Sequence, residues 1–370
     1  MNNNSHDSSH MAWLTLASAV NLASSKWFKV FEALSLSAVD VVNAYNTATP
    51  LHPVVTPLYE AINPYLIKRA LSWLASDPQH HIVSYQCPHY PQRLKTLDNP
   101  PLVLFVHGNP EVLNRPQIAI VGSRRASHQG KQIATEFAAT LARNKIVVIS
   151  GLAAGIDTAA HRGGVMEVGG TIAVMGTGPD TVYPSRNVQL YRNIIDEDGA
   201  CITEFFPGIS AKAWHFPRRN RIIAAMSLGT LVIEAKIKSG TLITANLAAD
   251  MGREVFAVPG SISHPYSEGC HWLIQQGAKL VTCVDDIFDE IAVQPCLITD
   301  KDEKISEKSE VINLATDRLL DSVDYDITTI DVIAQRCTMS VQQVMVELLQ
   351  YELRGLVAAI PGGYIKLRGK

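Results

Sequence analysis

The stretch Ile118-Ala119-Ile120-Val121-Gly122-Ser123-Arg124-Arg125 runs from four apolar residues into a glycine turn and two arginines. The apolar residues do not alternate with polar ones, which is typical of a strand that is buried on both faces of a sheet. Similar runs separated by helical patterns occupy Ile146–Ser150, Thr171–Met175, Ala200–Glu204, Thr230–Glu234, Glu254–Val258 and Lys279–Thr282. This alternation predicts an α/β fold, a doubly wound parallel sheet of the Rossmann type with helices on both faces.

Composition changes along the 370 residues predict smaller units on either side of this sheet. Residues 1–11 are rich in Asn, Ser and His, and are expected to be a leader or a disordered tail. Residues 12–85 predict a small helical (SAM-like) domain, and residues 86–295 carry the sheet. An acidic linker is expected at 296–315. Residues 316–370 have the helix, helix, helix, hairpin order that resembles a winged-helix domain.

The overall composition excludes several classes of protein. With 32 basic and 35 acidic residues, the net charge of −3 does not indicate a nucleic-acid binder, so such a function requires local clusters. The six cysteines show no CxxC spacing, which predicts a reduced, cytoplasmic protein without a cysteine metal site. No run of about 18 uncharged apolar residues occurs, so no membrane span is expected.

The turn after the first strand departs from nucleotide-binding motifs. Dinucleotide sites use GxGxxG there, but Arg124 takes the place of the second glycine, and the second strand ends at Ser150-Gly151 without an acid. No GxxxxGK[ST] motif occurs either, so neither NAD nor ATP is expected as a cofactor. A glycine turn, two guanidinium groups and a helix N-terminus remain, and they suit one phosphate of a larger ligand.

A second basic cluster lies in Phe205–Ile233, which contains no Asp or Glu. Its cations and rings, next to a helix predicted at Arg219–Met226, are Lys212, Trp214, His215, Phe216, Arg218, Arg219 and Arg221. Loops at the carboxyl ends of parallel strands converge, and basic loops with interleaved rings suit single-stranded nucleic acid. The alternative is that the aromatic residues are core and that the arginines pair with Glu204 and Glu234.

Two further motifs each allow two interpretations. Lys238-Ser239-Gly240-Thr241 opens a predicted helix, where it forms either an anion cradle or an ordinary N-cap. Asp157 and His161 are four residues apart on one helix face, as either a catalytic dyad or structural groups. No HExxH or GxSxG motif occurs, and no metal site is predicted.

These motifs, together with several flanking ones, resemble the DprA/Smf family of DNA-processing proteins. The blocks that carry the resemblance are Tyr90-Pro91, Pro100–Phe105, Ile120–Arg124, Ser150–Ala153, Gly155–Asp157, His161, Phe216–Ile223, Glu234-Ala235, Ser239–Ala245, Arg253–Gly260 and Gly277-Ala278. The resemblance implies an extended Rossmann domain that binds single-stranded DNA and forms a homodimer. It also implies loading of the RecA recombinase in natural transformation and recombination, without catalytic turnover.

The resemblance also implies which residues contact DNA: Gly122, Ser123, Arg124, Arg125, Lys212, Phe216, Arg218, Arg219, Arg221, Lys238, Ser239, Gly240 and Thr241. Ala154 stands where the family often has a basic residue, which puts a basic contribution from that loop in doubt. In the winged helix, the segment Ser340–Arg354 has Glu347 and Glu352 against a single Arg354. Because major-groove readers present basic or amide side chains, we expect this domain to contact protein.

Two other functions remain open at this point. LOG-type phosphoribohydrolases are nucleotide-processing enzymes with a similar core and a Gly-Gly-x-Gly-Thr loop, but this chain has Lys238-Ser239-Gly240-Thr241 there, without the leading glycine pair. The other alternative is a structural partner of RecA whose basic loops are paired internally.

Overall fold

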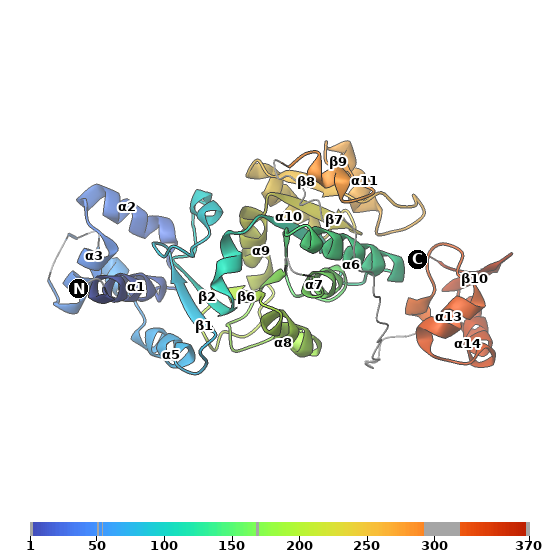
Figure 1. Ribbon diagram of the computed structural model, residues 1–370, viewed down its shortest axis with the longest axis horizontal. Helices are drawn as coiled ribbons and strands as arrows, with labels where there is room; N and C mark the ends of the chain where they lie inside the picture. Colours follow the sequence, from blue (N-terminus) through green and yellow to red (C-terminus); the bar gives the residue numbers. More distant parts are fainter. Residues whose placement is uncertain (1–2, 50–51, 54, 168–169, 292–318, 368–370) are drawn as a thin grey trace.

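A nine-stranded sheet forms the middle of the computed structural model, which describes residues 3–49, 52–53, 55–167, 170–291 and 319–367 (Figure 1). Its spatial order is β1-β2-β6-β5-β4-β3-β7-β8-β9. The strands are β1 His80–Ser84, β2 Val103–Gly108, β3 Gln117–Gly122, β4 Val147–Ser150, β5 Thr171–Val174, β6 Ala200–Thr203, β7 Gly229–Ile233, β8 Glu254–Ala257 and β9 Lys279–Leu280.

In this spatial order, all the strands from β6 across to β9, including β5, β4, β3, β7 and β8, run parallel. At the other edge, β2 pairs antiparallel with β6, and β1 pairs antiparallel with β2. The chain starts the parallel part at β3, builds outward through β4, β5 and β6, and then returns to the other side of β3 as β7. The strand order therefore reverses between β3 and β7. In open parallel sheets ligands bind outside the carboxyl ends of the strands at such a reversal.

Helices cover both faces of the sheet, as the unbroken apolar strands predicted. Ala119 and Val121 of β3 belong to the core under α9 His215–Met226, α10 Gly240–Asp250 and α11 Glu268–Gln275. Ile118 and Ile120 face the opposite core, under α6 His128–Arg143, α7 Ile156–Val165 and α12 Asp285–Phe288. α8 Val188–Asp196 covers that second face farther along. Short 3₁₀ turns complete the chain at η1 Gln92–Thr96, η2 Pro110–Asn114, η3 Ser185–Asn187 and η4 Leu320–Ser322.

The N-terminal helices share one apolar core with the antiparallel edge of the sheet. They are α1 Asn3–Ala17, α2 Ser24–Leu34, α3 Ala38–Asn46, α4 Thr56–Tyr59 and α5 Pro64–Leu74. In this core Trp13, Trp27 and Trp73 pack with Phe105 of β2 and with Phe206.

Two sequence-based boundaries differ from the structure here. α1 begins at Asn3, and the His10 ring lies 3.0 Å from the Ser84 hydroxyl, so the expectation of a disordered tail over 1–11 is wrong for the helical part. The helix extends backward because the buried residues after Met11 anchor it to the sheet. Strand β1 pairs with β2, so residues 80–84 belong to the sheet and not to the helical unit predicted for 12–85.

The C-terminal unit has its own core and the elements of a winged helix. It contains α13 Ile330–Cys337, α14 Val341–Leu353 and the hairpin β10 Val357–Ile360 with β11 Gly363–Lys366. Ser340 and Gln343 form a reciprocal capping box that starts α14. The predicted linker 296–315 lies outside the described residues. Within the described part of the chain, no helix is long and apolar enough to cross a membrane.

Candidate nucleic-acid interface

A hollow of about 500 Å³ opens at the reversal of strand order. We call it the switch pocket. Its walls are the turn after β3, one side of α9, the loop after β7 with the start of α10, and a ring from the loop after β8. The residues that line it include Gly122, Ser123, Arg124, Arg125, Ala153, Asp157, Phe216, Arg219, Asn220, Ile223, Lys236, Lys238, Ser239, Gly240, Thr241 and Tyr266.

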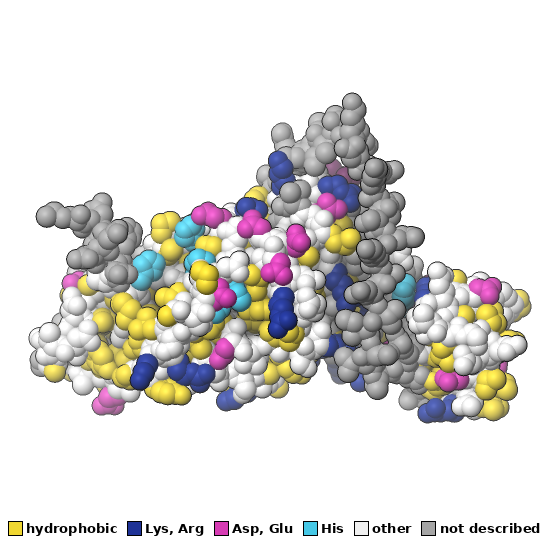
Figure 2. Space-filling view, turned by 60° about the horizontal axis from the view of Figure 1, so that its bottom comes forward, with side chains coloured by type: hydrophobic (Ala, Val, Ile, Leu, Met, Phe, Trp, Pro, Cys, Tyr) yellow, Lys and Arg dark blue, Asp and Glu magenta, His cyan; other side chains and the backbone are white. Residues whose placement is uncertain are grey.

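Four exposed cations surround this pocket: Arg124, Arg125, Lys236 and Lys238. Among the residues that the structure describes, none of the four has a carboxylate partner. On the face drawn in Figure 2, Lys and Arg side chains lie among Asp and Glu. The four cations make the switch pocket locally positive, although the net charge of the whole chain is −3.

Two aromatic rings lie beside these cations. The Arg124 guanidinium is 5.5 Å from the centre of the Phe216 ring, and the Lys236 ammonium is 5.2 Å from that of Tyr266. Phe216 is half-buried, and its ring lies where a side chain on Gly176 would be, so it is held from behind. Cations for phosphates and rings for bases therefore share one hollow.

The start of α10 lines the switch pocket with hydrogen-bond donors that lack partners in the described part of the chain. Ser239 has the N-cap position of this helix, but its side chain makes no cap hydrogen bond. Its hydroxyl is buried and has no partner among the described residues. The first N–H groups of a helix also lack partners within it, so a phosphate oxygen could satisfy several donors here. The structure therefore lacks the ordinary capping bond of the alternative interpretation.

Packing requires a glycine at position 122. A Cβ on this residue would lie 2.0 Å from the Ile233 carbonyl oxygen of β7 and 2.4 Å from the Ile156 side chain. Gly155 has a φ of +81°, and a Cβ on this residue would lie 2.1 Å from the Ser123 carbonyl oxygen. Gly122 therefore lets β3, β7 and α7 meet, in addition to lining the switch pocket.

Arg219 is placed differently from the other predicted contacts. It is 3% exposed and donates from Nη1 to the carbonyl oxygens of Gly151, at 2.6 Å, and of Val174. Burial lowers its pKa to about 10, while the nearby Asp157 acts in the opposite direction. Arg219 thus ties together the ends of β4 and β5 behind the pocket, and it is no exposed phosphate ligand in this conformation.

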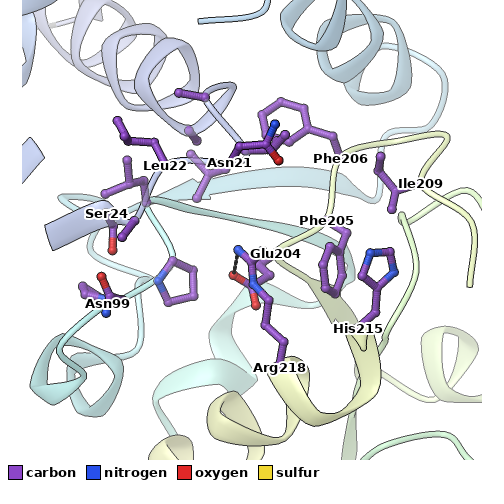
Figure 3. A pocket seen from close by; sticks show the side chains of 18 of the residues that line it. Asn21, Leu22, Ser24, Asn99, Glu204, Phe205, Phe206, Ile209, His215 and Arg218 are labelled. Carbon is purple, nitrogen blue, oxygen red and sulfur yellow. Dashed lines mark hydrogen bonds and ion pairs between the residues drawn. The ribbon is translucent and has the colours of Figure 1, made fainter. Parts of the chain in front are cut away.

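Arg218 and Arg221 lie on the other side of α9, in a second hollow of about 420 Å³ that we call the Glu204 pocket. Both donate to Glu204, at 3.0 and 2.6 Å, and Figure 3 shows this carboxylate directed at Arg218. Lys212 and the exposed Trp214 also line this hollow. The alternative of internal pairing is therefore correct for these two arginines and Glu204, whereas Glu234 binds Ser127 instead.

Asp157 and His161 do not form a catalytic dyad. The Asp157 carboxylate accepts the N–H of Gly151 at 3.2 Å and that of Ala153 at 3.4 Å. His161 is fully buried, with Nε2 accepting from the Leu152 N–H and Nδ1 beside the Thr171 hydroxyl. Burial lowers the His161 pKa to about 3, so the ring stays neutral and both its nitrogens are used. These residues hold the loop after β4.

The structure thus divides the predicted contacts between the two pockets. The switch pocket gathers Gly122, Ser123, Arg124, Arg125, Phe216, Lys238, Ser239, Gly240 and Thr241, with Arg219 behind it, and the Glu204 pocket holds Lys212, Arg218 and Arg221. Sequence reasoning missed Lys236, Asn220 and Tyr266. Lys236 was detectable, because it lies between a predicted strand and the Lys238 motif.

Comparison with known proteins agrees with this geometry. A family model of DNA recombination-mediator protein A matches residues 81–292, and one of the DprA winged helix domain matches residues 312–363. The chain belongs to the DprA/Smf family. Its DprA-type sheet and winged helix are the fold that the sequence predicted, and the family is one of DNA-processing proteins.

Two curated DprA/Smf relatives cover much of the chain. Protein Smf of Escherichia coli K12 is 40% identical over 304 residues, which span 82% of this chain and 81% of that protein. DNA processing protein DprA of Streptococcus pneumoniae is 47% identical over 201 residues, which span 54% of this chain and 71% of that protein.

Solved DprA structures resemble this structure as well. The X-ray structure of DprA from Streptococcus pneumoniae has a TM-score of 0.64 at 36% identity, covering 76% of this chain and 97% of that one. A DprA structure from Helicobacter pylori, described as giving insights into the unique single-stranded DNA binding mode of that protein, has a TM-score of 0.52 at 26% identity. It covers 57% of this chain and 94% of that one.

Proposed function

We propose that this protein binds single-stranded DNA in the switch pocket and passes it to the RecA recombinase, without catalytic turnover. The observation that carries the proposal is the group of four exposed cations without carboxylate partners beside two rings, at the reversal of the parallel sheet. The single-stranded DNA bound by the Helicobacter pylori relative supports the same ligand for this chain.

An unpaired strand fits this pocket better than a duplex. Stacking on Phe216 and Tyr266 requires bases that are not already stacked in pairs, whereas phosphates can follow Arg124, Arg125 and the start of α10. In the winged helix, the half-buried Glu347 and the exposed Glu352 on α14 would repel a duplex backbone. We therefore assign the winged helix to a protein contact.

Three parts of the proposal derive from the family resemblance. They are the transfer of DNA to RecA in natural transformation and recombination, homodimer formation through the Rossmann domain, and action in the cytoplasm. The division into a helical, a Rossmann and a winged-helix domain is likewise proposed, with the first boundary moved before β1.

An enzyme of the LOG phosphoribohydrolase class is the second candidate. Its support is the shared core and the Gly240-Thr241 end of the loop after β7. Against it, His161 is neutral with both nitrogens engaged, and the Asp157 carboxylate is bound to backbone N–H groups, so neither is free to move protons. Incubation with nucleoside monophosphates tests this candidate, and release of free base would support it.

Fluorescence anisotropy with a labelled oligonucleotide tests the proposed function. We expect tighter binding to a single strand than to the matching duplex at two salt concentrations. Arg125→Ala should lower affinity about fivefold at 0.1 M salt, since one phosphate contact contributes about −0.7 to the slope of log K against log salt.

The matched control is Arg218→Ala. Both arginines are exposed, but Arg218 already pairs with Glu204, so its loss should change affinity less than twofold. Equal losses in the two variants, or a preference for duplex, would contradict the proposed site. A loss confined to certain base sequences would also argue against contacts to phosphate.

A further inference from the structure

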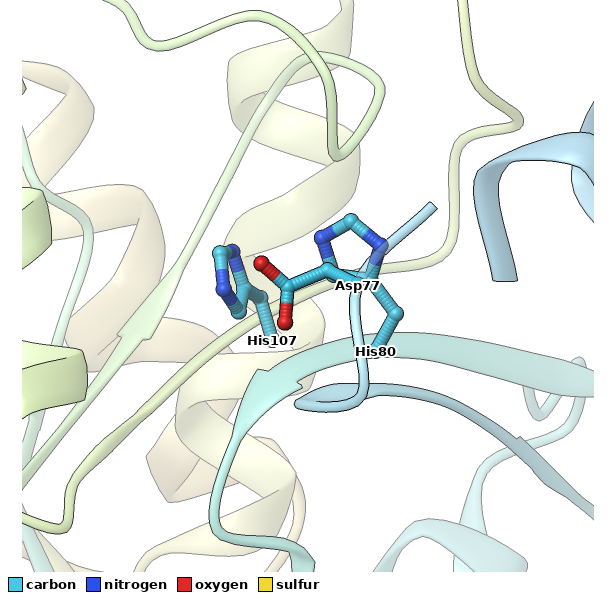
Figure 4. Close-up of side chains that lie close together, drawn as sticks. All are labelled: Asp77, His80 and His107. Carbon is cyan, nitrogen blue, oxygen red and sulfur yellow. The ribbon is translucent and has the colours of Figure 1, made fainter. Parts of the chain in front are cut away.

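A group of metal-ligand side chains lies at the antiparallel edge, on the α5–β1 turn and on strands β1 and β2. It consists of Asp77, His80 and His107, with one ligand atom from each within 4.8 Å of the others. His80 and His107 are direct partners in the β1–β2 register, so their rings project from the same face of the sheet. Asp77 precedes His80 by one turn of chain, and in the view of Figure 4 its carboxylate lies between the two rings.

Both rings are oriented by partners on their far nitrogens. His80 Nδ1 lies 2.7 Å from the Trp73 carbonyl oxygen, and the Trp73 ring stacks on the imidazole with centroids 4.0 Å apart. His107 Nδ1 lies 2.7 Å from the Tyr191 hydroxyl. A Nδ1–H donated to each oxygen leaves Nε2 of each ring as a free electron-pair donor. A backbone carbonyl is a usual outer partner of a metal-bound histidine, and the Tyr191 hydroxyl oxygen takes the same acceptor position for His107.

The Asp77 carboxylate is also held in position. Oδ1 of Asp77 accepts the Gln79 N–H at 2.8 Å, which fixes the group and leaves Oδ2 for a ligand. All three side chains are half-buried, so a cation could reach them from solvent while losing part of its hydration shell.

We propose that Asp77, His80 and His107 bind a zinc ion, with water as the fourth ligand. Two imidazoles with one carboxylate suit a late first-row cation, whereas Mg²⁺ and Ca²⁺ prefer oxygen ligands alone. The ion would join the end of α5 to strands β1 and β2, and so fix the N-terminal helices on the sheet. The site is separate from the switch pocket, since they have no residue in common.

Zinc affinity of the full chain, freed of metal with a chelator, tests the proposal. It is measured by competition with a chromogenic chelator and by thermal unfolding with Zn²⁺ or Mg²⁺. We expect Zn²⁺ but not Mg²⁺ to raise Tm, because a ligand that binds only the folded state stabilises it. Asp77→Asn and His107→Gln should each lower zinc affinity at least about 10-fold. Loss of a group that only hydrogen-bonds to a metal ligand already lowers metal affinity by about that factor, and these two residues are ligands themselves.

The matched control is His81→Gln, a histidine on the same strand whose side chain projects to the opposite face. It should keep wild-type zinc affinity, and Tyr191→Phe should lower the affinity by about 10–100-fold through His107. Asp77→Asn keeps the acceptor for Gln79, so it tests the site even if His107→Gln fails to fold. Wild-type affinity in Asp77→Asn, or an equal loss in His81→Gln, would overturn the proposal.

Discussion

Arginines close together in sequence have different roles here because their immediate neighbours differ. Arg125 ends in solvent at the pocket rim, whereas Arg218 is directed at Glu204 and Arg219 is enclosed by carbonyl oxygens. A paired or buried guanidinium is poorly placed to gain a phosphate contact, because it would first lose an existing partner. Residue type therefore identifies candidates for DNA contact, and the neighbouring carboxylates and carbonyls select among them.

The buried His161 should make stability fall in acid. Its folded-state pKa is about 3, against an ordinary value of about 6.5, so below pH 6.5 the unfolded chain binds a proton that the folded chain refuses. Stability contributed by the neutral ring is thus complete above that pH and is lost as pH falls toward 3. Between about pH 7.5 and pH 5 we expect a loss of about 2 kcal/mol.

Urea unfolding of wild type and His161→Gln across this range measures the effect. The difference between the two proteins isolates His161 from Asp157, whose pKa burial raises. The free energy of unfolding of the variant should depend less steeply on pH, and the difference in slope should correspond to about one bound proton. Parallel pH curves for the two proteins would contradict the lowered pKa, because they would show that His161 takes up its proton over the same pH range in the folded and unfolded states.

At the scale of elements, two glycines at the switch pocket differ in the space around them, so one position is structural and the other leaves room for a side chain. A Cβ at Gly122 would overlap the backbone of β7, while at Gly240 no atom lies within 4 Å. We expect Gly122→Ala to cost about 1–3 kcal/mol or more, because neither strand can move aside cheaply. Gly240→Ala should leave stability unchanged or raise it by up to about 1 kcal/mol, since Ala favours helix.

Thermal and urea unfolding of both variants tests this contrast. An unaltered Tm in Gly122→Ala would show that β3 and β7 are less rigidly packed than the structure indicates. A large loss of stability in Gly240→Ala would show that the start of α10 is itself tightly enclosed.

The strands could be predicted from sequence because burial on both faces leaves continuous apolar runs that end at glycine or polar residues. For example, Ile118–Val121 and Thr171–Met175 lie within one residue of β3 and β5. Strand order could not be predicted, since no local pattern states which strands pair. The antiparallel edge was missed for that reason.

The site was predicted only in part, and α9 shows why. The sequence analysis began this helix at Arg219, whereas it begins at His215. Because the first turn of α9 was not predicted, the side of the helix on which each residue lies could not be inferred. All four residues were therefore assigned to one surface: Phe216, Arg218, Arg219 and Arg221. The ion pair with Glu204 also joins residues from two different elements, which no spacing within one segment reveals.

At the scale of the whole molecule, the switch pocket and the core of the winged helix share no residue, although the Tyr325 ring lies 4.6 Å from the His264 ring of the loop after β8. Every residue that lines the switch pocket lies between positions 121 and 266, and the C-terminal core is made of residues 319–364. A protein ending at Ile291 should therefore bind single-stranded DNA within about threefold of wild type. With four pocket cations, the slope of log K against log salt should stay near about −3 in both proteins.

Anisotropy titrations of the two proteins over several salt concentrations test this expectation. A large loss of affinity or a much shallower slope in the shortened protein would show that the winged helix itself supplies phosphate contacts.

The position of α9 affects how mutants of this protein should be interpreted. One side of this helix lines the switch pocket, and the other side lines the Glu204 pocket. Ile222 and Ile223 of this helix are buried in the sheet core, and Ile223 also lines the switch pocket. A small tilt of α9 caused by a change at either position would displace Phe216 and Arg218 together. Random mutagenesis for recombination defects should therefore recover alleles under this helix, and a binding assay alone would misassign them to the DNA-contacting surface.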